Sequence, residues 1–186
     1  GTSIGTLDVA PASQDLTTFE YELFEGDVRG THLRTLLAEA AVGRYEYVVL
    51  DSPPSLGLLT INVLVAADRV IVPLQPEYFA LEGITSLMAT IDRVRATLNP
   101  GLAVEGIVLT MWDARNRLAL QVADEVRRHF RVFESVIPRN VRLSEAPSHG
   151  LPVLLYDVEC KGAQGYLGLA REVIEGQRER DGTAIG

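Results

Sequence analysis

Asp51 is the first residue whose position suggests chemistry. It lies in the stretch YVVLDSPPSLG, residues 47–57, directly after an apolar run that is typical of a buried strand. Asp-Ser-Pro-Pro is ordinary turn chemistry, and a solvated turn is the simplest interpretation. A carboxylate at the carboxyl end of a parallel strand is also where open α/β folds place their ligands, and there it would hold Mg²⁺ or a water. Taken alone, the stretch favours the turn.

Arginines form a second candidate site. Residues 111–142 contain seven arginines and four acidic residues, a local charge of +3 in a chain whose net charge is −8. Arginine suits phosphate contacts because its guanidinium is always charged and donates two hydrogen bonds as a fork. The alternative is a solvated helix face with internal ion pairs. It applies to Arg127 and Arg128, which have Asp124 and Glu125 three or four residues away.

Other reactive residues form no recognisable pattern. The three histidines share no ligand spacing with one another or with the single cysteine, Cys160, so they predict no metal site. No G-x-S-x-G motif is present. The single lysine, Lys161, follows no predicted strand and has no Ser or Thr after it, so KGAQGY is not a phosphate-binding loop.

The elements that would position these residues alternate between strands and helices. Continuous apolar runs predict strands at 45–51, 69–75 and 103–111, with weaker candidates at 7–12 and 131–138. Apolar spacings of three and four predict helices at 80–98 and 116–130. A glycine followed by a basic residue ends a predicted helix at 31–44, a segment that is apolar all round predicts a buried helix at 58–67, and a last helix is predicted at 160–180. This alternation predicts an α/β fold with a mostly parallel sheet flanked by helices. We expect one domain over residues 1–176 and a mobile charged tail over residues 177–186.

The composition is that of an ordinary globular domain. The 186 residues are 47% hydrophobic and 23% charged. No apolar run approaches the ~20 residues that cross a bilayer. A single cysteine fits a reducing cytoplasm.

Four stretches resemble the ParA/Soj family of chromosome- and plasmid-partitioning ATPases, which are relatives of the division-site ATPase MinD. They are LDSPPSLGLLTINVL, VPLQPEYFALEGITSL, GIVLTMWDARNRLALQV and VIPRNVRLSEAPSHGLPVLLYD. The resemblance extends over residues 6–176, and the run IPRNVRLSEAPSHG within it is long and specific.

The resemblance implies a P-loop ATPase fold with a deviant Walker A motif. Such proteins sandwich two ATP molecules with Mg²⁺ in a homodimer, and their ATP-bound form binds double-stranded DNA without sequence preference. A ParB-like protein on a centromere-like DNA site stimulates hydrolysis. The resemblance therefore also implies a cytoplasmic, nucleoid-associated protein with no membrane partner.

The resemblance also assigns roles to single residues. Asp51 matches the Walker B aspartate, a catalytic residue that holds Mg²⁺ through a water. Pro138 and Asn140, in PRNVRL, match residues that help enclose the adenine, although a plain strand-to-helix turn is the alternative. Arg115 and Arg142 match positions of nonspecific DNA contact. Few aromatic residues accompany them, so duplex phosphates are a better target than stacked single strands.

One family motif is absent. The family begins with a KGGVGKT-type loop, and these 186 residues contain no such sequence. We therefore expect the P-loop strand and the catalytic loop to lie outside this chain, which would be inactive alone. The strands that flank the missing one would expose unpaired backbone, so the isolated chain would be marginally stable. The alternative is an ATPase-inactive DNA- or partner-binding remnant of the family.

Overall fold

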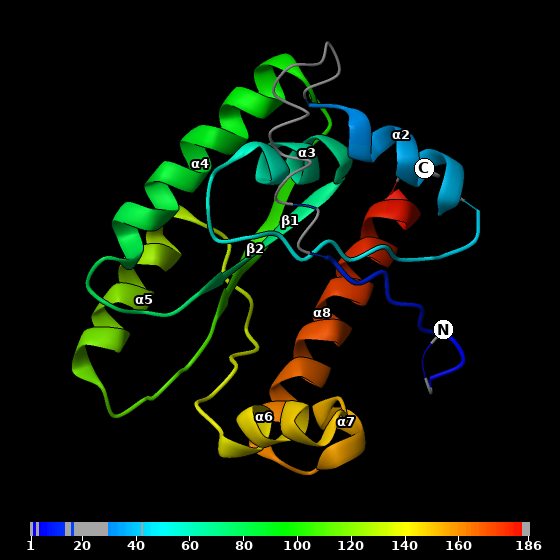
Figure 1. Ribbon diagram of the computed structural model, residues 1–186. Coiled ribbons are helices and arrows are strands. Elements are labelled where there is room, and N and C mark those ends of the chain that lie inside the picture. Colours follow the sequence, from blue (N-terminus) through cyan, green and yellow to red (C-terminus); the bar gives the residue numbers. More distant parts are fainter. Residues whose placement is uncertain (1, 3, 14–15, 17–29, 42, 184–186) are drawn as a thin grey trace. The chain divides into compact units, whose positions relative to one another are not determined.

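The computed structural model describes residues 2, 4–13, 16, 30–41 and 43–183 (Figure 1). The chain divides into two compact units, of which the first comprises residues 1–68 and 91–102 and the second residues 69–90 and 103–186. Helix α4 (Ala80–Thr97) contributes residues to both units. The expected single domain over residues 1–176 stays a prediction.

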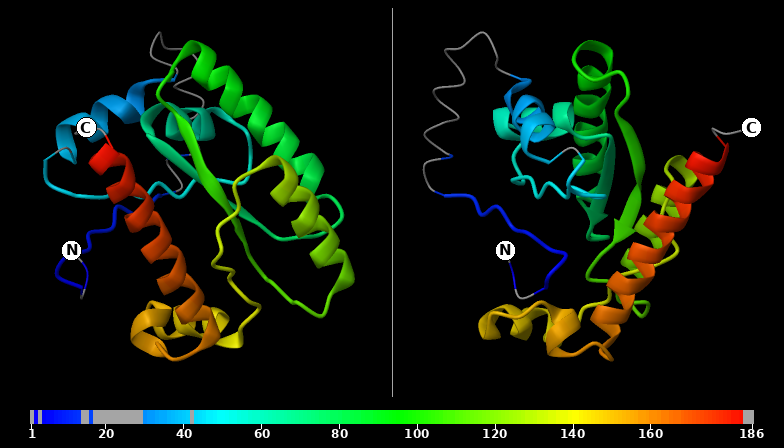
Figure 2. Two further views of the ribbon diagram at one scale, coloured as in Figure 1. Left: turned by 180° about the vertical axis from the view of Figure 1, so that it is seen from behind. Right: turned by 90° about the vertical axis from the view of Figure 1, so that its right-hand side faces the viewer.

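A parallel sheet forms the centre of the second unit. Strands β1 (Arg69–Leu74) and β2 (Ala103–Leu109) pair in parallel and run side by side in Figures 1 and 2. The segment 131–138 follows the other edge of β2. There the backbone N–H of Ile107 donates to the carbonyl of Arg131 at 2.9 Å, and that of Ile137 donates to Leu109 at 2.8 Å. The sequence predicted both strands, and this segment is an interrupted third one.

Helices cover the two faces of this sheet because side chains alternate along a strand. On one face, β1 and β2 pack against α4 and α5 (Arg117–His129). The buried residues there are Val72, Leu74, Ile84, Ile107, Leu109, Val122, Ala123 and Val126. On the other face, Val108 and Phe133 pack against Leu169 of α8 (Lys161–Thr183). The predicted α/β architecture with a parallel sheet between helices is confirmed.

Three short helices precede α8 in the second unit: α6 (Val141–Glu145), the 3-10 helix η1 (Ala146–His149) and α7 (Val153–Tyr156). Both α6 and α7 contact α8 and lie beside its N-terminal end in Figures 1 and 2. Because α8 continues to Thr183, residues 177–183 of the predicted tail are helical. Within the described residues, no helix is both long enough and apolar enough to traverse a bilayer.

The first unit contains α2 (His32–Ala40) and α3 (Leu58–Ala66), which pack together. Polar side chains bind the carbonyl groups at the C-terminal end of α3. The Nε of Arg34 donates to the carbonyl of Val65 at 2.9 Å, and Asn99 donates from its Nδ2 to the carbonyls of Leu64 and Ala67 at 3.0 and 2.8 Å. The helix predicted at 58–67 is therefore confirmed, and the one predicted at 31–44 forms over His32–Ala40, with residue 42 outside the described residues.

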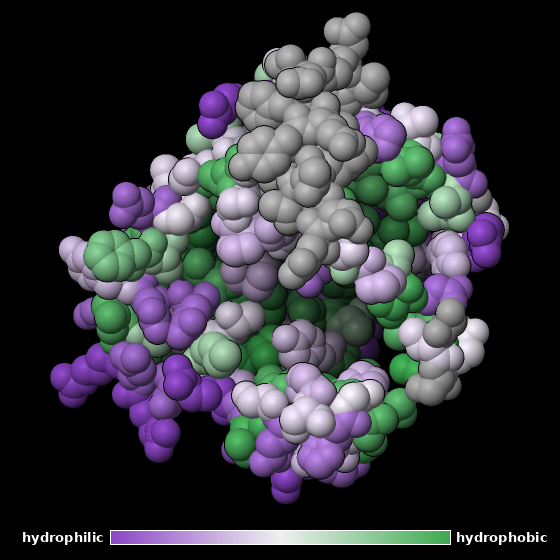
Figure 3. Space-filling model, viewed as in Figure 1, coloured by the Kyte–Doolittle hydropathy of each residue, from purple (hydrophilic) through white to green (hydrophobic). Residues whose placement is uncertain are grey.

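The predicted strand at residues 45–51 is wrong, as is the weaker candidate at 7–12. Both segments are irregular. Val49 is 89% exposed and Tyr47 is 43% exposed. Apolar surface, coloured green, also appears among polar side chains elsewhere on the face of the molecule that Figure 3 shows. An apolar segment becomes a strand only when a neighbour accepts and donates its backbone hydrogen bonds. None of the described strands pairs with residues 45–51.

Candidate functional site

Asp51 lies in the first unit, at the end of the irregular segment 45–51 and before α3. Its side chain is exposed, as are those of residues 52–56. The following turn is fastened to α3 by Thr60, whose buried hydroxyl donates to the carbonyl of Ser55 at 2.5 Å. The carboxylate is therefore open to solvent and is held by a turn rather than by a paired strand end.

The other predicted site residues all lie in the second unit, on segments that follow β2 in the sequence. The chain leaves this strand through Met111, whose φ of 51° is the only positive value among the described non-glycine residues. Such backbone strain is often found at functional sites. Trp112 then forms an isolated parallel bridge with Pro138. This bridge brings together two loops, residues 112–116 before α5 and residues 138–140 before α6.

Arg115 lies in the first of these loops. Its guanidinium makes a two-pronged contact with Asp113, with Nε–Oδ1 and Nη2–Oδ2 distances of 3.0 and 3.1 Å. The hydrogen bonds from Arg115 lower the pKa of the Asp113 carboxyl, and the same contact raises the pKa of Arg115. The Arg115 side chain is nevertheless 91% exposed, so its remaining donors are open to a phosphate.

Asn140 lies in the second loop and begins α6. Its Oδ1 accepts the backbone N–H of Arg142 at 2.9 Å, which is an N-cap interaction. With that oxygen engaged, the amide group Nδ2 is the part of Asn140 that could donate to a nucleobase. The helix cap gives Asn140 a structural role in addition to its predicted nucleotide contact.

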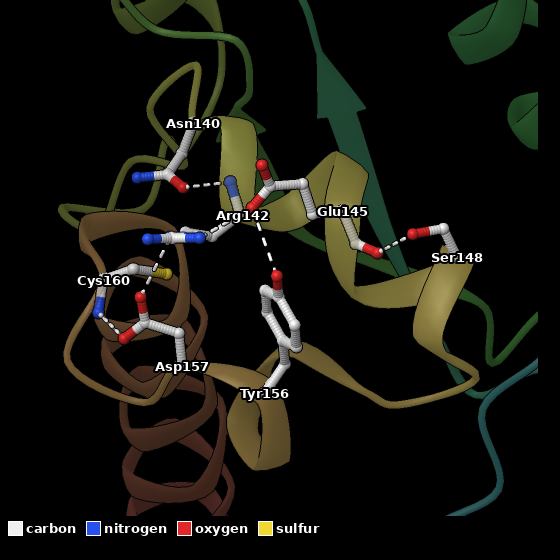
Figure 4. Close-up of polar contacts among 7 residues, drawn as sticks. All are labelled: Asn140, Arg142, Glu145, Ser148, Tyr156, Asp157 and Cys160. Atoms are coloured by element: carbon white, nitrogen blue, oxygen red, sulfur yellow. Dashed lines mark hydrogen bonds and ion pairs between the residues drawn. The ribbon is translucent and has the colours of Figure 1, made fainter.

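Arg142 lies between two carboxylates (Figure 4). Its Nη1 donates to Oε2 of Glu145 at 2.9 Å, and its Nε lies 3.3 Å from Oδ2 of Asp157. The guanidinium carbon is 6.0 Å from the centre of the Tyr156 ring, and the Tyr156 hydroxyl donates to Glu145 at 3.3 Å. The hydrogen bond to Glu145 is the main reason why the pKa of Arg142 is raised.

The predicted ion pairs on α5 are present. Arg127 lies 3.5 Å from Asp124, and Arg128 lies 2.7 Å from Glu125. However, the proposed DNA-contacting residues Arg115 and Arg142 also have carboxylate partners. The sequence suggested that ion pairing would distinguish Arg127 and Arg128 from the proposed DNA-contacting arginines, and the structure shows that it does not.

Sequence reasoning missed the partners of Arg142. Glu145, three residues further along the same helix, could have been found from helical spacing. Asp157 and Tyr156 could not, because the turns of η1 and α7 are what return the chain to Arg142. Within the described residues, no group of three His, Cys, Asp or Glu side chains could hold a metal ion.

The fold of the chain is that of a P-loop NTPase. The structure of cobyrinic acid a,c-diamide synthase from Mycobacterium smegmatis with bound ADP and magnesium is similar, with a TM-score of 0.75 and 31% identity over 90% of this chain and 62% of that one. The cell division ATPase MinD of Pyrococcus furiosus has a TM-score of 0.65 and 22% identity over 80% of this chain and 59% of that one. The second similarity supports the fold alone.

Sequence comparison then gives the family. A family model described as an AAA domain matches residues 2–104. The chromosome partitioning protein ParA of Caulobacter vibrioides is 56% identical over 98% of this chain and 70% of that protein. The sporulation initiation inhibitor protein Soj of Bacillus subtilis is 51% identical over 92% of this chain and 68% of that protein. The chain belongs to the ParA/Soj family of chromosome-partitioning ATPases.

Proposed function

We propose that this protein is a partitioning ATPase that dimerises with ATP, binds duplex DNA without sequence preference and segregates a chromosome or plasmid. A ParB-like centromere-binding partner would stimulate hydrolysis, and the protein would act in the cytoplasm on the nucleoid. The observation that carries the proposal is the 56% identity to a chromosome partitioning protein over nearly the whole chain. The matched region includes all five proposed site residues.

The exposed carboxylate of Asp51 fits a role in holding Mg²⁺. Mg²⁺ keeps most of its waters and needs a fixed carboxylate one water away. The Asp51 side chain is exposed to solvent, so its oxygens can accept from such a water. On the second unit, Asn140 would donate from its Nδ2 to the base, and Pro138 would pack beside it. When bound, ATP and Mg²⁺ supply the phosphoryl group and the charge that neutralises it.

The 186 residues contain no glycine-rich loop with a lysine that could bind the phosphates. Wrapping a triphosphate needs several backbone N–H groups from a glycine-rich loop and a lysine, and the only lysine is Lys161 at the start of α8. This observation favours the second candidate, an ATPase-inactive DNA- or partner-binding remnant, for a protein consisting of these 186 residues alone.

ATP hydrolysis by the full gene product, with duplex DNA and the ParB-like partner added, tests the proposal. We expect stimulated turnover that Asp51→Ala lowers by well over tenfold, with a smaller effect on ATP binding. Asp68→Ala, which removes another exposed aspartate of the first unit, is the matched control and should leave turnover unchanged. Turnover by the Asp51→Ala variant equal to that of the wild type would show that Asp51 is only a solvated turn residue.

A further inference from the structure

Arg142 and the two carboxylates that contact it carry a net negative charge. One guanidinium faces two carboxylates, those of Glu145 and Asp157, so these three side chains together carry a charge of −1. All three side chains remain partly exposed: Arg142 is 48% exposed, Glu145 39% and Asp157 32%. A DNA phosphate that approached Arg142 in this conformation would therefore meet two like charges within a few ångströms of its partner.

The two carboxylates occupy different edges of the guanidinium. Glu145 accepts from Nη1 and Asp157 lies beside Nε, so the contacts are spread along the fork that would otherwise grip a phosphate. Neighbouring groups hold both carboxylates in place. The Tyr156 hydroxyl donates to Glu145, and the second oxygen of Asp157 accepts the backbone N–H of Cys160 at 3.1 Å (Figure 4).

We propose that Glu145 and Asp157 form an autoinhibitory clamp on Arg142, which duplex DNA phosphates must displace before Arg142 can contact them. The inference rests on the proposed function, because it assigns a control element to the same DNA-binding surface. Ion pairs between exposed side chains contribute little to stability, so phosphate can compete with these carboxylates at low cost.

The test is a filter-binding titration of the full gene product with ATP and a duplex of arbitrary sequence. We expect Glu145→Gln and Asp157→Asn each to strengthen binding by about threefold to tenfold at low salt, because each removes one charge that opposes the phosphate. Both replacements keep an acceptor oxygen for Tyr156 or Cys160. The dependence of log K on log salt should steepen, with a limit of about 0.9 for each new phosphate contact.

Two controls separate a clamp from a general charge effect. Asp124→Asn removes an exposed carboxylate that is paired with Arg127 on α5, and it should change binding by less than about twofold. In an Arg142→Ala background, Glu145→Gln and Asp157→Asn should lose most of their effect, because the cation that they restrain is gone. Tyr156→Phe removes the hydroxyl that steadies Glu145 but keeps the ring, and it should strengthen binding more weakly.

Three results would overturn the inference. If Glu145→Gln and Asp157→Asn strengthened DNA binding equally with and without Arg142, or if Asp124→Asn strengthened it as much, the effect would come from the overall charge of the protein and not from a clamp. Weaker binding by Glu145→Gln and Asp157→Asn, with unchanged circular dichroism, would show that the carboxylates position Arg142 for DNA instead. No DNA binding by the wild type with ATP would refute the proposed function itself, and the inference with it.

Discussion

Arg180 is expected to stabilise the packing of α8 on β2. Its Nη1 lies 2.8 Å from Oε1 of Glu105, whose side chain is only 2% exposed. Two other guanidiniums are more distant from this carboxylate: Arg131 lies 3.5 Å from Oε1, and Arg69 lies 3.9 Å from Oε2. Arg180 thus makes the shortest contact with a carboxylate that is buried beneath α8.

The size of the effect follows from this geometry. Removing one partner of a buried ion pair costs about 3–5 kcal/mol, and a hydrogen bond to a charged group contributes about 1.5–3 kcal/mol. Arg131 and Arg69 remain near Glu105 in an Arg180→Ala variant, so the carboxylate keeps some compensation. We therefore expect a loss of about 2 kcal/mol in the free energy of unfolding.

Urea unfolding, followed by circular dichroism, measures this loss. Arg178→Ala is the matched control, because Arg178 is an exposed arginine on the same helix and should cost less than about 0.5 kcal/mol. The double variant should lose less stability than the sum of the losses from Arg180→Ala and Glu105→Gln, since both changes remove the Arg180–Glu105 ion pair. Additive losses, or an Arg180→Ala variant as stable as Arg178→Ala, would refute the reasoning.

Glu172 should make stability depend on pH. Burial raises its pKa, but hydrogen bonds from Ser135 and from the backbone N–H of Glu134 lower it more, so the net pKa lies below 4.5. The resulting stability is present above the unfolded pKa and is lost as pH falls through the folded one. Urea unfolding of Glu172→Gln should therefore vary less than that of the wild type between about pH 6 and about pH 3; equal slopes would contradict this. The 186-residue chain alone should hydrolyse no ATP above background in a phosphate-release assay, because it has no P-loop donors for the transition state. Turnover that Asp51→Ala abolishes would contradict this expectation. In the full gene product with ATP, Arg115→Glu and Arg142→Glu should each weaken binding to all duplex sequences and flatten its salt dependence, with ATP binding intact. A loss confined to one DNA sequence would argue against phosphate contacts.

The sequence predicted those elements whose signals are local. The apolar stripe of α4 and the continuous apolar run of β2 depend on neighbouring residues, and both elements form within the predicted ranges. The run at 45–51 has the same local signal but forms no strand, because a strand also needs a partner that no local pattern supplies. Its failure shows the limit of apolar runs as evidence.

The candidate site divides in the same way. Asn140 caps a helix, as its residue type and position after a proline turn suggest. Only one of the two carboxylates that contact Arg142 could be predicted from the sequence. Helical spacing indicates Glu145, but the contact with Asp157 depends on how η1 and α7 turn the chain.

Binding of the full gene product to two duplexes of unrelated sequence, measured with ATP and with ADP, tests the central claim most directly. The proposed function predicts that both duplexes bind with similar affinity in ATP and much more weakly in ADP, with a strong decrease as salt rises. Equal binding in the two nucleotides would contradict a nucleotide-controlled partitioning protein. Binding to neither duplex in ATP would contradict the assignment of Arg115 and Arg142 to DNA contact.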